Sequence, residues 1–148
     1  MNTRRTLISY CVHLVLLICL MCGPNNVSAA PSSLADSSYK YNYCLYYEGA
    51  STSISLNYRY IMEHLVEKLK SDNKLFVHIR GHVCCGPGEK ISTKRAKKVY
   101  NFLKGQGVPV ERMSYKGYSN EVPLIWPEKT RDAEASNRRV DFILTRKD

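Results

Sequence analysis

The sequence predicts an α/β two-layer sandwich with the element order β-α-β-α-β-β, in which helices cover one face of a mixed four-stranded sheet. Two observations predict this fold. Four short apolar or aromatic segments have strand character, and two longer segments carry apolar residues with helical periodicity. About 110 residues remain after the apolar N-terminal segment, which is enough for a single two-layer core.

An export signal is predicted over residues 1–30. Two arginines near the start precede an almost entirely apolar run at 7–22, and small residues at 27–29 suit signal-peptidase cleavage after Ala29 or Ala30. A retained N-terminal anchor is the alternative, because the apolar run is only slightly shorter than the roughly 20 residues that span a bilayer. Cleavage is the favoured prediction, and the mature protein is then exported.

The stretch 31–40 is small and polar, and it is predicted to be a flexible leader to a folded domain over 41–148. The aromatic-rich segment 41–47 has strong strand propensity. Apolar residues then fall on one face of a helix over 61–69, and residues 75–79 alternate as a second strand. The first half of the domain is therefore β-α-β.

A second helix is predicted to begin at Ser92, a favourable N-cap, and to end at Gly105. Basic residues that face water are frequent between Lys94 and Lys104. The apolar residues of one stripe would be buried against the sheet, and they are Ala96, Val99, Tyr100 and Leu103.

Two strands complete the domain, at 112–116 and 140–144. The polar stretch between them contains two prolines, and it is predicted to form a loop with a short helix at 133–136. Trp126 is predicted to be a hydrophobic plug beneath this loop. Arg139, just before the last strand, is predicted to lie at the strand edge in solvent.

The disulfide pairing is left open by the sequence. Cleavage of the signal would leave Cys44, Cys84 and Cys85 in a compartment that permits disulfides. Three cysteines allow one bridge and leave one thiol. The candidate pairs are 44–84, 44–85 and the adjacent pair 84–85.

The domain is basic. The whole chain has a formal net charge of +9, and loss of Arg4 and Arg5 leaves 20 Lys and Arg against 13 Asp and Glu, a net charge of +7. A basic exported domain could favour an anionic wall polymer, a membrane surface or nucleic acid. A well-solvated basic surface without a specific partner explains the charge equally well.

Several short motifs stand in order along residues 41–145. They are Gly81-His82, Ile91-Ser92-x-x-Arg95-Ala96, Gly107-Val108, Arg112-Met113-Ser114-x-x-Gly117-Tyr118 and Asn137-Arg138-Arg139-Val140. In this order and spacing the chain resembles the OmpA-like domains of the bacterial envelope. The resemblance implies a non-enzymatic domain, in the periplasm or at the outer membrane, that binds the diaminopimelate of peptidoglycan and links membrane to wall. Its partners would be peptidoglycan and envelope proteins, not nucleic acid.

The resemblance also implies which residues bind the ligand. Arg95 matches the family arginine, whose guanidinium can fork onto a carboxylate through two hydrogen bonds. Ser92 lies near it at the start of the helix, where backbone N–H groups at 91–94 and the helix dipole favour the same anion. His82 and Arg138 match residues near the family pocket. His82 would be a structural hydrogen-bonding residue, and Arg138 would brace a loop or hold a carboxylate.

Cys84 stands where the family usually has the aspartate that takes the ligand ammonium, because Val83-Cys84 replaces Thr-Asp. A Cys84 thiolate could replace the carboxylate, a disulfide with Cys44 or Cys85 would remove the charge, and a packed cysteine would be neutral. Export favours the disulfide and the packed cysteine over the thiolate. The alternative function is therefore a structural protein-interaction module of an envelope complex that keeps the fold without binding peptidoglycan.

Patterns for metal binding and catalysis are weak or missing in the sequence. His78, His82, Cys84 and Cys85 could surround a metal ion, but adjacent cysteines are poorly placed to chelate one ion together and no C-x-x-C pair occurs. The chain also lacks the nucleophile-elbow, H-E-x-x-H and phosphate-binding glycine motifs. The prediction is no metal, no cofactor and no enzymatic activity.

Overall fold

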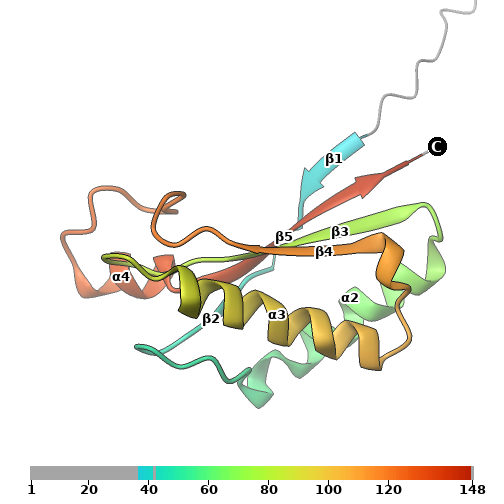
Figure 1. Ribbon diagram of the computed structural model, residues 1–148, viewed down its shortest axis with the longest axis horizontal. Helices are drawn as coiled ribbons and strands as arrows, with labels where there is room; N and C mark the ends of the chain where they lie inside the picture. Colours follow the sequence, from blue (N-terminus) through green and yellow to red (C-terminus); the bar gives the residue numbers. More distant parts are fainter. Residues whose placement is uncertain (1–36, 42, 148) are drawn as a thin grey trace, which may run out of the picture. The chain divides into compact units, whose positions relative to one another are not determined.

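The computed structural model describes residues 37–41 and 43–147, which form two layers (Figure 1). Helices α2 (Arg59–Ser71) and α3 (Glu89–Gly105) lie on one side of a mixed five-stranded sheet, which confirms the predicted α/β sandwich. The predicted signal peptide at 1–30 and most of the leader lie outside the described residues. None of the described helices is long and apolar enough to cross a membrane.

The sheet has the strand order β1-β5-β3-β4, and β2 also pairs with β5. The pairing of β3 with β4 is parallel, and the pairings of β5 are antiparallel. The strands are β1 (Ser37–Lys40), β2 (Leu45–Tyr46), β3 (Leu75–Gly81), β4 (Met113–Gly117) and β5 (Arg139–Arg146). The last strand of the chain therefore has neighbours on both sides.

Within the predicted first strand at 41–47, only Leu45–Tyr46 (β2) is a strand among the described residues. The last four residues of the predicted leader form a further strand, β1, and β1 and β2 both pair with β5. Just after β1, the backbone N–H of Tyr41 donates to Phe142 O at 2.9 Å. The sheet therefore has five strands rather than the predicted four, and β1 lies in residues that were predicted to belong to the leader.

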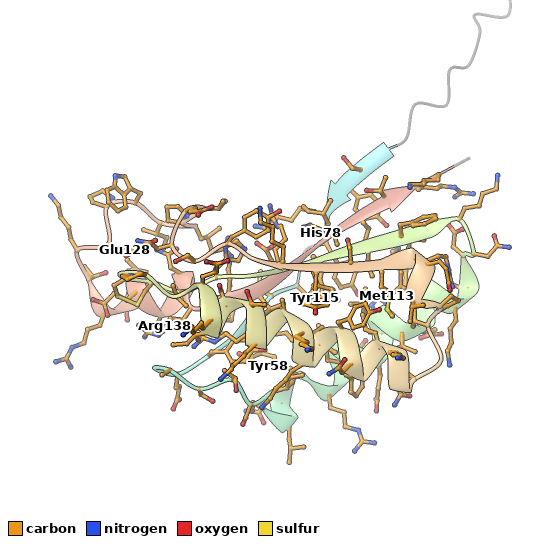
Figure 2. The ribbon with its side chains drawn as sticks, in the orientation of Figure 1. Tyr58, His78, Met113, Tyr115, Glu128 and Arg138 are labelled. Carbon is orange, nitrogen blue, oxygen red and sulfur yellow. A yellow bond between two sulfur atoms is a disulfide. The ribbon has the colours of Figure 1, made fainter. Side chains whose placement is uncertain are left out.

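The core lies between one face of the sheet and the facing sides of α2 and α3. Alternate residues of β3 are buried, and α2 and α3 bury residues that are mostly three or four positions apart. Figure 2 shows Met113 and Tyr115 pointing from β4 toward α3, whereas His78 lies on the other face of the sheet. Core side chains without exposed surface include Leu65, Leu69, Ile79, Val99, Leu103, Val140, Phe142 and Leu144.

Helix α3 packs very closely on the ends of β3 and β4, and both strands end in glycine. A Cβ on Gly81 would lie 2.0 Å from the backbone oxygen of Ser92, and a Cβ on Gly117 would lie 2.3 Å from Thr93 Oγ1. Real Cβ atoms do not make contacts this short. The two glycines therefore allow the first turns of α3 to reach the strand ends.

Helix α3 begins four residues earlier than predicted. Its first residue is Glu89 and its N-cap is Gly88, so the predicted capping role of Ser92 is wrong. Ser92 is fully buried, and its hydroxyl donates to Glu89 O at 3.0 Å and accepts from Ser119 N at 3.2 Å. The side chain that resembled a helix cap instead ties α3 to the chain that follows β4.

The segment between β4 and β5 contains a longer helix than predicted. Helix α4 covers Arg131–Asn137 rather than 133–136, and Thr130 Oγ1 caps it by accepting from Ala133 N at 3.1 Å. Trp126 is 77% exposed, so its predicted role as a buried plug is wrong. Other interactions must therefore hold the conformation of the loop before α4.

The side chain of buried Asn137 holds the loop before α4 through hydrogen bonds to its backbone. Its Oδ1 accepts from Leu124 N at 2.6 Å and from Ile125 N at 3.0 Å, and its Nδ2 donates to Ile125 O at 2.9 Å. These bonds replace the hydrophobic plug that the sequence predicted. They also hold a loop whose apolar side chains are exposed, and these are Val122, Leu124, Ile125 and Trp126.

Candidate functional site

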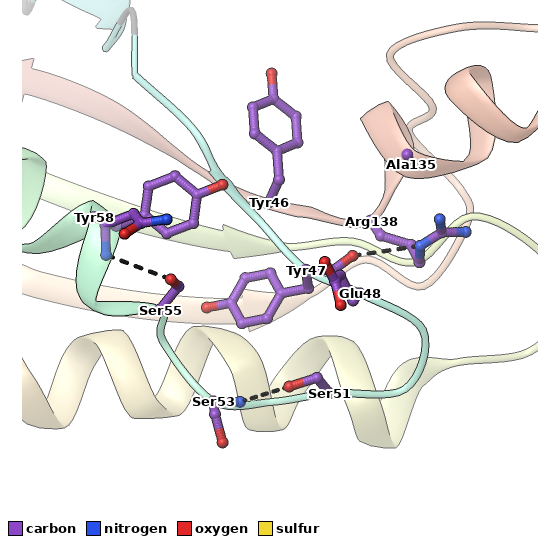
Figure 3. A pocket seen from close by; sticks show the side chains of 10 residues that line it. Tyr46, Tyr47, Glu48, Ser51, Ser53, Ser55, Tyr58, Ala135 and Arg138 are labelled. Atoms are coloured by element: carbon purple, nitrogen blue, oxygen red, sulfur yellow. Dashed lines mark hydrogen bonds between the residues drawn. The ribbon is translucent and has the colours of Figure 1, made fainter.

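A cavity of about 550 Å³ opens where the segment after β2 passes the end of α4 (Figure 3). Glu48 and Arg138 bring charges of opposite sign to its wall. Hydroxyl groups supply much of the remaining lining, and they belong to Ser51, Ser53, Ser55 and Tyr58 among others. The cavity therefore offers one anion and one cation to a small ligand that carries both charges.

Arg138 connects this cavity with the cysteine loop. Its Nε donates to Tyr47 O at 3.4 Å, and its Nη1 lies 3.4 Å from Cys84 Sγ and 3.5 Å from Glu134 Oε2. The side chain is 19% exposed. Because contacts of this length are weak, the guanidinium can turn to a stronger acceptor.

Arg95 lies beneath the cavity and fixes the loop that forms part of its wall. Its Nε donates to Ser51 O at 2.8 Å and its Nη2 donates to Gly49 O at 2.7 Å. Its Nη1 donates to His82 O at 2.9 Å, and the guanidinium carbon lies 4.6 Å from the centre of the Tyr47 ring. Arg95 has no exposed surface, so ligand contact at Arg95 would require this loop to move.

His82 and Ser92 also lie in the interior. The ring of His82 is 1% exposed, its Nε2 lies 3.4 Å from Asp141 Oδ1, and burial lowers the pKa of the imidazole below its usual value. The ring is therefore neutral at pH 7 and donates to the carboxylate. The backbone N–H of Ser92 already donates to Gly88 O at 2.9 Å, so it offers no free donor to an anion.

Asp141 is the centre of a buried ionic cluster that the sequence did not reveal. Arg80 forks onto its carboxylate at 2.7 and 3.1 Å, and Arg139 donates to it at 3.1 Å. Lys40 adds an ion pair at 3.6 Å. Burial alone would raise the pKa of Asp141, but hydrogen bonds from His82 and Arg80 outweigh burial and hold the pKa well below its usual range. Arg139 is buried, so its predicted place in solvent is wrong.

Cys84 and Cys85 are bonded to each other as an adjacent disulfide, and Cys44 is unpaired among the described residues. The pair 84–85 is thus the one of the three candidate pairs that the structure contains. In this state no thiolate is present at Cys84. Cys84 is half-buried and Cys85 is exposed, so the disulfide lies at the surface beside Arg138.

The structure divides the five predicted ligand residues into two groups. Cys84 and Arg138 lie together at the surface, whereas Arg95, His82 and Ser92 are buried below them. The second group supports the loops and strand ends around the cavity. A direct role in ligand binding stays a prediction for each of the five.

Sequence reasoning missed two acidic residues of this region. Glu48 follows β2 in the loop that Arg95 holds, and Glu134 lies on α4 one turn before Arg138. Isolated glutamates in polar segments carry no pattern that marks a site. The only available signal was the i,i+4 spacing of Glu134 and Arg138, which is typical of a helix surface pair.

Comparisons with known proteins agree with this fold. The model of the OmpA family matches residues 46–138. The peptidoglycan-associated lipoprotein from Burkholderia pseudomallei is similar with a TM-score of 0.65 and 24% identity, over 68% of this chain and 88% of that chain. The periplasmic domain of Helicobacter pylori MotB is similar with a TM-score of 0.60 and 18% identity, over 70% of each chain. The cell wall anchor of the T6SS from Pseudomonas aeruginosa has a TM-score of 0.60 and 22% identity, over 68% of this chain and 75% of that chain.

These structural similarities, all below 25% identity, show the fold. No curated protein gives a significant sequence match. The family match covers more than half of the chain, and it contains both main helices, β3, β4 and every residue that lines the cavity. The chain belongs to the OmpA family.

Proposed function

We propose that this chain is a non-enzymatic cell-envelope domain that binds peptidoglycan through the diaminopimelate of the stem peptide and links a membrane to the wall. The observation that carries this proposal is the cavity with Glu48 and Arg138 in its wall. Diaminopimelate presents an ammonium group and carboxylates, so one anion and one planar cation match its charges. Membership of the OmpA family and similarity to a peptidoglycan-associated lipoprotein support the same ligand.

Arg138 and Glu48 have the main roles in this proposal. Arg138 forks onto a ligand carboxylate, which replaces its long contacts with shorter, charge-assisted hydrogen bonds. Glu48 is exposed and receives the ammonium group, a task that the disulfide at Cys84 cannot perform. Arg95 acts indirectly, because it fixes the loop that carries the cavity wall.

An NMR titration with a diaminopimelate-containing muropeptide tests the proposal on the natively oxidised protein. We expect shifts at 46–58 and around Arg138, and we expect Arg138→Glu to remove them. Arg131→Glu is the matched control, because Arg131 is exposed on α4, the helix that Arg138 caps, and does not line the cavity. Binding that survives Arg138→Glu would refute the assignment of Arg138, and a silent wild-type spectrum would refute the ligand.

The proposed location is the periplasm or the outer-membrane side of the envelope, after removal of the export signal. Sequencing the N-terminus of the protein recovered from the envelope tests this. A start after Ala29 or Ala30 supports cleavage. A chain that keeps the apolar run 7–22 would instead be held in a membrane by its own N-terminus.

The exposed loop before α4 favours a second candidate function, a structural protein-interaction module. Buried Asn137 holds this loop while Leu124, Ile125 and Trp126 face solvent, and a held apolar surface of this kind is typical of protein docking. A silent muropeptide titration, together with capture of an envelope protein by the wild type but not by Trp126→Ser, would favour this module over wall binding.

A further inference from the structure

Glu134 lies beside the two cysteines that the sequence singled out. The ligand atoms of Cys84, Cys85 and Glu134 lie within 4.8 Å of one another, and no other group of three or more such residues is this close in the part of the chain that the structure describes. We propose that the reduced form of the protein binds a thiophilic divalent metal ion, such as Zn²⁺, through these three side chains. This metal site is a function in addition to the proposed wall binding. The 84–85 disulfide prevents metal binding in the oxidised protein.

The charges of the cluster support a divalent ion. Arg138 Nη1 lies 3.4 Å from Cys84 Sγ and 3.5 Å from Glu134 Oε2. In the oxidised state the charges of Glu134 and Arg138 cancel. Reduction and loss of two protons give two thiolates and one carboxylate against one guanidinium, a net charge of −2. A divalent cation neutralises this charge, and Arg138 favours the thiolate at Cys84.

The donor set selects the class of metal. Two thiolates and one carboxylate suit Zn²⁺ and related soft ions rather than Mg²⁺ or Ca²⁺, which prefer oxygen ligands. Neither histidine of the stretch 78–82 belongs to this group: both ring nitrogens of His78 contact Ser114 Oγ and Tyr118 Oη, and His82 Nε2 contacts Asp141. A fourth position is left for water, as in sites with three protein ligands.

The site is reachable from solvent and can adjust to an ion. Cys85 is exposed, Cys84 is half-buried, and the Glu134 side chain is 39% exposed. Tetrahedral zinc with Zn–S bonds of about 2.3 Å needs its sulfur atoms roughly 3.8 Å apart. Once the disulfide is broken, rotation about the two Cα–Cβ bonds separates the sulfur atoms. Glu134 approaches from a different element, α4, and supplies a third ligand that the cysteine spacing alone does not indicate.

Opening the site requires a dithiol reductant. The dithiol passes two electrons and two protons to the 84–85 disulfide, and its own sulfur atoms close into a disulfide. Metal binding then displaces the two thiol protons to solvent. The oxidised protein has no thiolate in the cluster, so metal binding depends on the redox state.

Metal titration of the reduced protein tests this inference. The full chain is treated with a dithiol, freed from it under nitrogen and titrated with Zn²⁺ against a chromophoric chelator. We expect one more Zn²⁺ per reduced wild-type chain than per Cys84→Ser/Cys85→Ser chain, and no difference between the two when oxidised. Cd²⁺ in place of Zn²⁺ should give thiolate-to-metal absorption in the ultraviolet. Cys44→Ser is the control and should keep both signals.

A carboxylate variant tests the third ligand. Glu134→Gln should weaken Zn²⁺ binding at least about tenfold, since even partners outside the ligand shell are worth roughly 10- to 100-fold. It should keep the Cd²⁺ absorption, because both thiolates remain. Asp132→Asn, an exposed change on the same helix, should bind like wild type.

Two results would overturn the inference. In the first, dithiol-treated wild type has the same number of alkylated thiols as Cys84→Ser/Cys85→Ser, instead of two more. The 84–85 disulfide is then not reduced. In the second, the thiols appear but the reduced wild type binds no more Zn²⁺ than this double variant. Circular dichroism of each variant verifies that the fold is intact, and the muropeptide titration is independent of both results.

Discussion

Arg95 shapes the cavity from below, because its guanidinium holds three backbone carbonyls and the ring of Tyr47 covers it. Hydrogen bonds from a charged donor are worth roughly 1.5–3 kcal/mol each. The importance of Arg95 could be predicted from its motif, but its burial could not. That burial depends on the loop 49–51 folding over it, and the small polar residues of this loop give no sign of doing so. The position of Glu48 depends on the same loop.

We expect Arg95→Met to lower the free energy of unfolding by about 3 kcal/mol, because it leaves carbonyls near the cavity without their donor. Urea unfolding followed by circular dichroism measures this change. Lys97→Met is the control, since Lys97 is exposed on the same helix, and it should change stability by no more than about 0.5 kcal/mol. Equal stability of the two variants would show that Arg95 does not hold the loop.

Asp141 makes the stability depend on pH in the acid range. Its pKa in the folded protein is depressed, so its stabilising effect is fully present above the unfolded value of about 3.9 and declines as pH falls toward the folded value. We expect Asp141→Asn to cost about 3 kcal/mol at pH 6, because it leaves Arg80 and Arg139 without their anion. The difference between wild type and variant should shrink between about pH 4 and pH 2. A constant difference over this range would contradict the depressed pKa.

At the scale of single elements, α3 shows how a pattern can predict a helix and misplace its start. The apolar stripe correctly predicted that Ala96, Val99 and Leu103 would be buried. Serine is a common N-cap and therefore favours a start at Ser92, whereas the hydroxyl of this serine accepts from Ser119 N, beyond β4. The contact with Ser119, 27 residues away in the sequence, outweighs the local preference of serine for an N-cap. No local sequence pattern indicates this contact.

The close packing of α3 predicts a contrast between two glycines. Gly81→Ala should destabilise the fold by roughly 2–3 kcal/mol, because its Cβ would overlap the backbone of α3. Gly105→Ala adds a Cβ with nothing within 4 Å at the last residue of α3, and it should stabilise by up to about 1 kcal/mol. Thermal unfolding of both variants measures the contrast. Similar midpoints for the two would show that α3 tolerates a shift.

At the scale of the whole molecule, the sequence predicted the two layers but not the pairing of strands within the sheet. Periodicity is local, so β3, β4, β5 and the helices were recognisable one by one. The positions of β1 and of the short β2 depend on pairing with β5, about 100 residues later. The same non-local pairing sets Arg80 opposite Asp141, and the ionic cluster was invisible for that reason.

The net charge of the whole molecule predicts two components of binding to wall sacculi. Attraction by the chain's net charge of +9 is long-ranged, and it should weaken as ionic strength rises from about 0.05 M to 0.5 M. Contact in the cavity should persist in high salt and should disappear in Arg138→Glu. Sedimentation of the protein with sacculi at several salt concentrations separates the two components. Complete loss of wild-type binding in high salt would mean that charge attraction alone accounts for binding to sacculi, without contact in the cavity.

The chain contains one tryptophan, and it is the exposed Trp126. Its fluorescence reports a water-facing indole already in the folded state, so unfolding changes this emission little, and stability is better followed by circular dichroism. The same property makes Trp126 a built-in optical probe. A protein or membrane that covers the loop before α4 would shift the emission to the blue and shield it from iodide. A ligand confined to the cavity would leave the emission unchanged, so a single fluorescence experiment distinguishes docking on the loop from binding in the cavity.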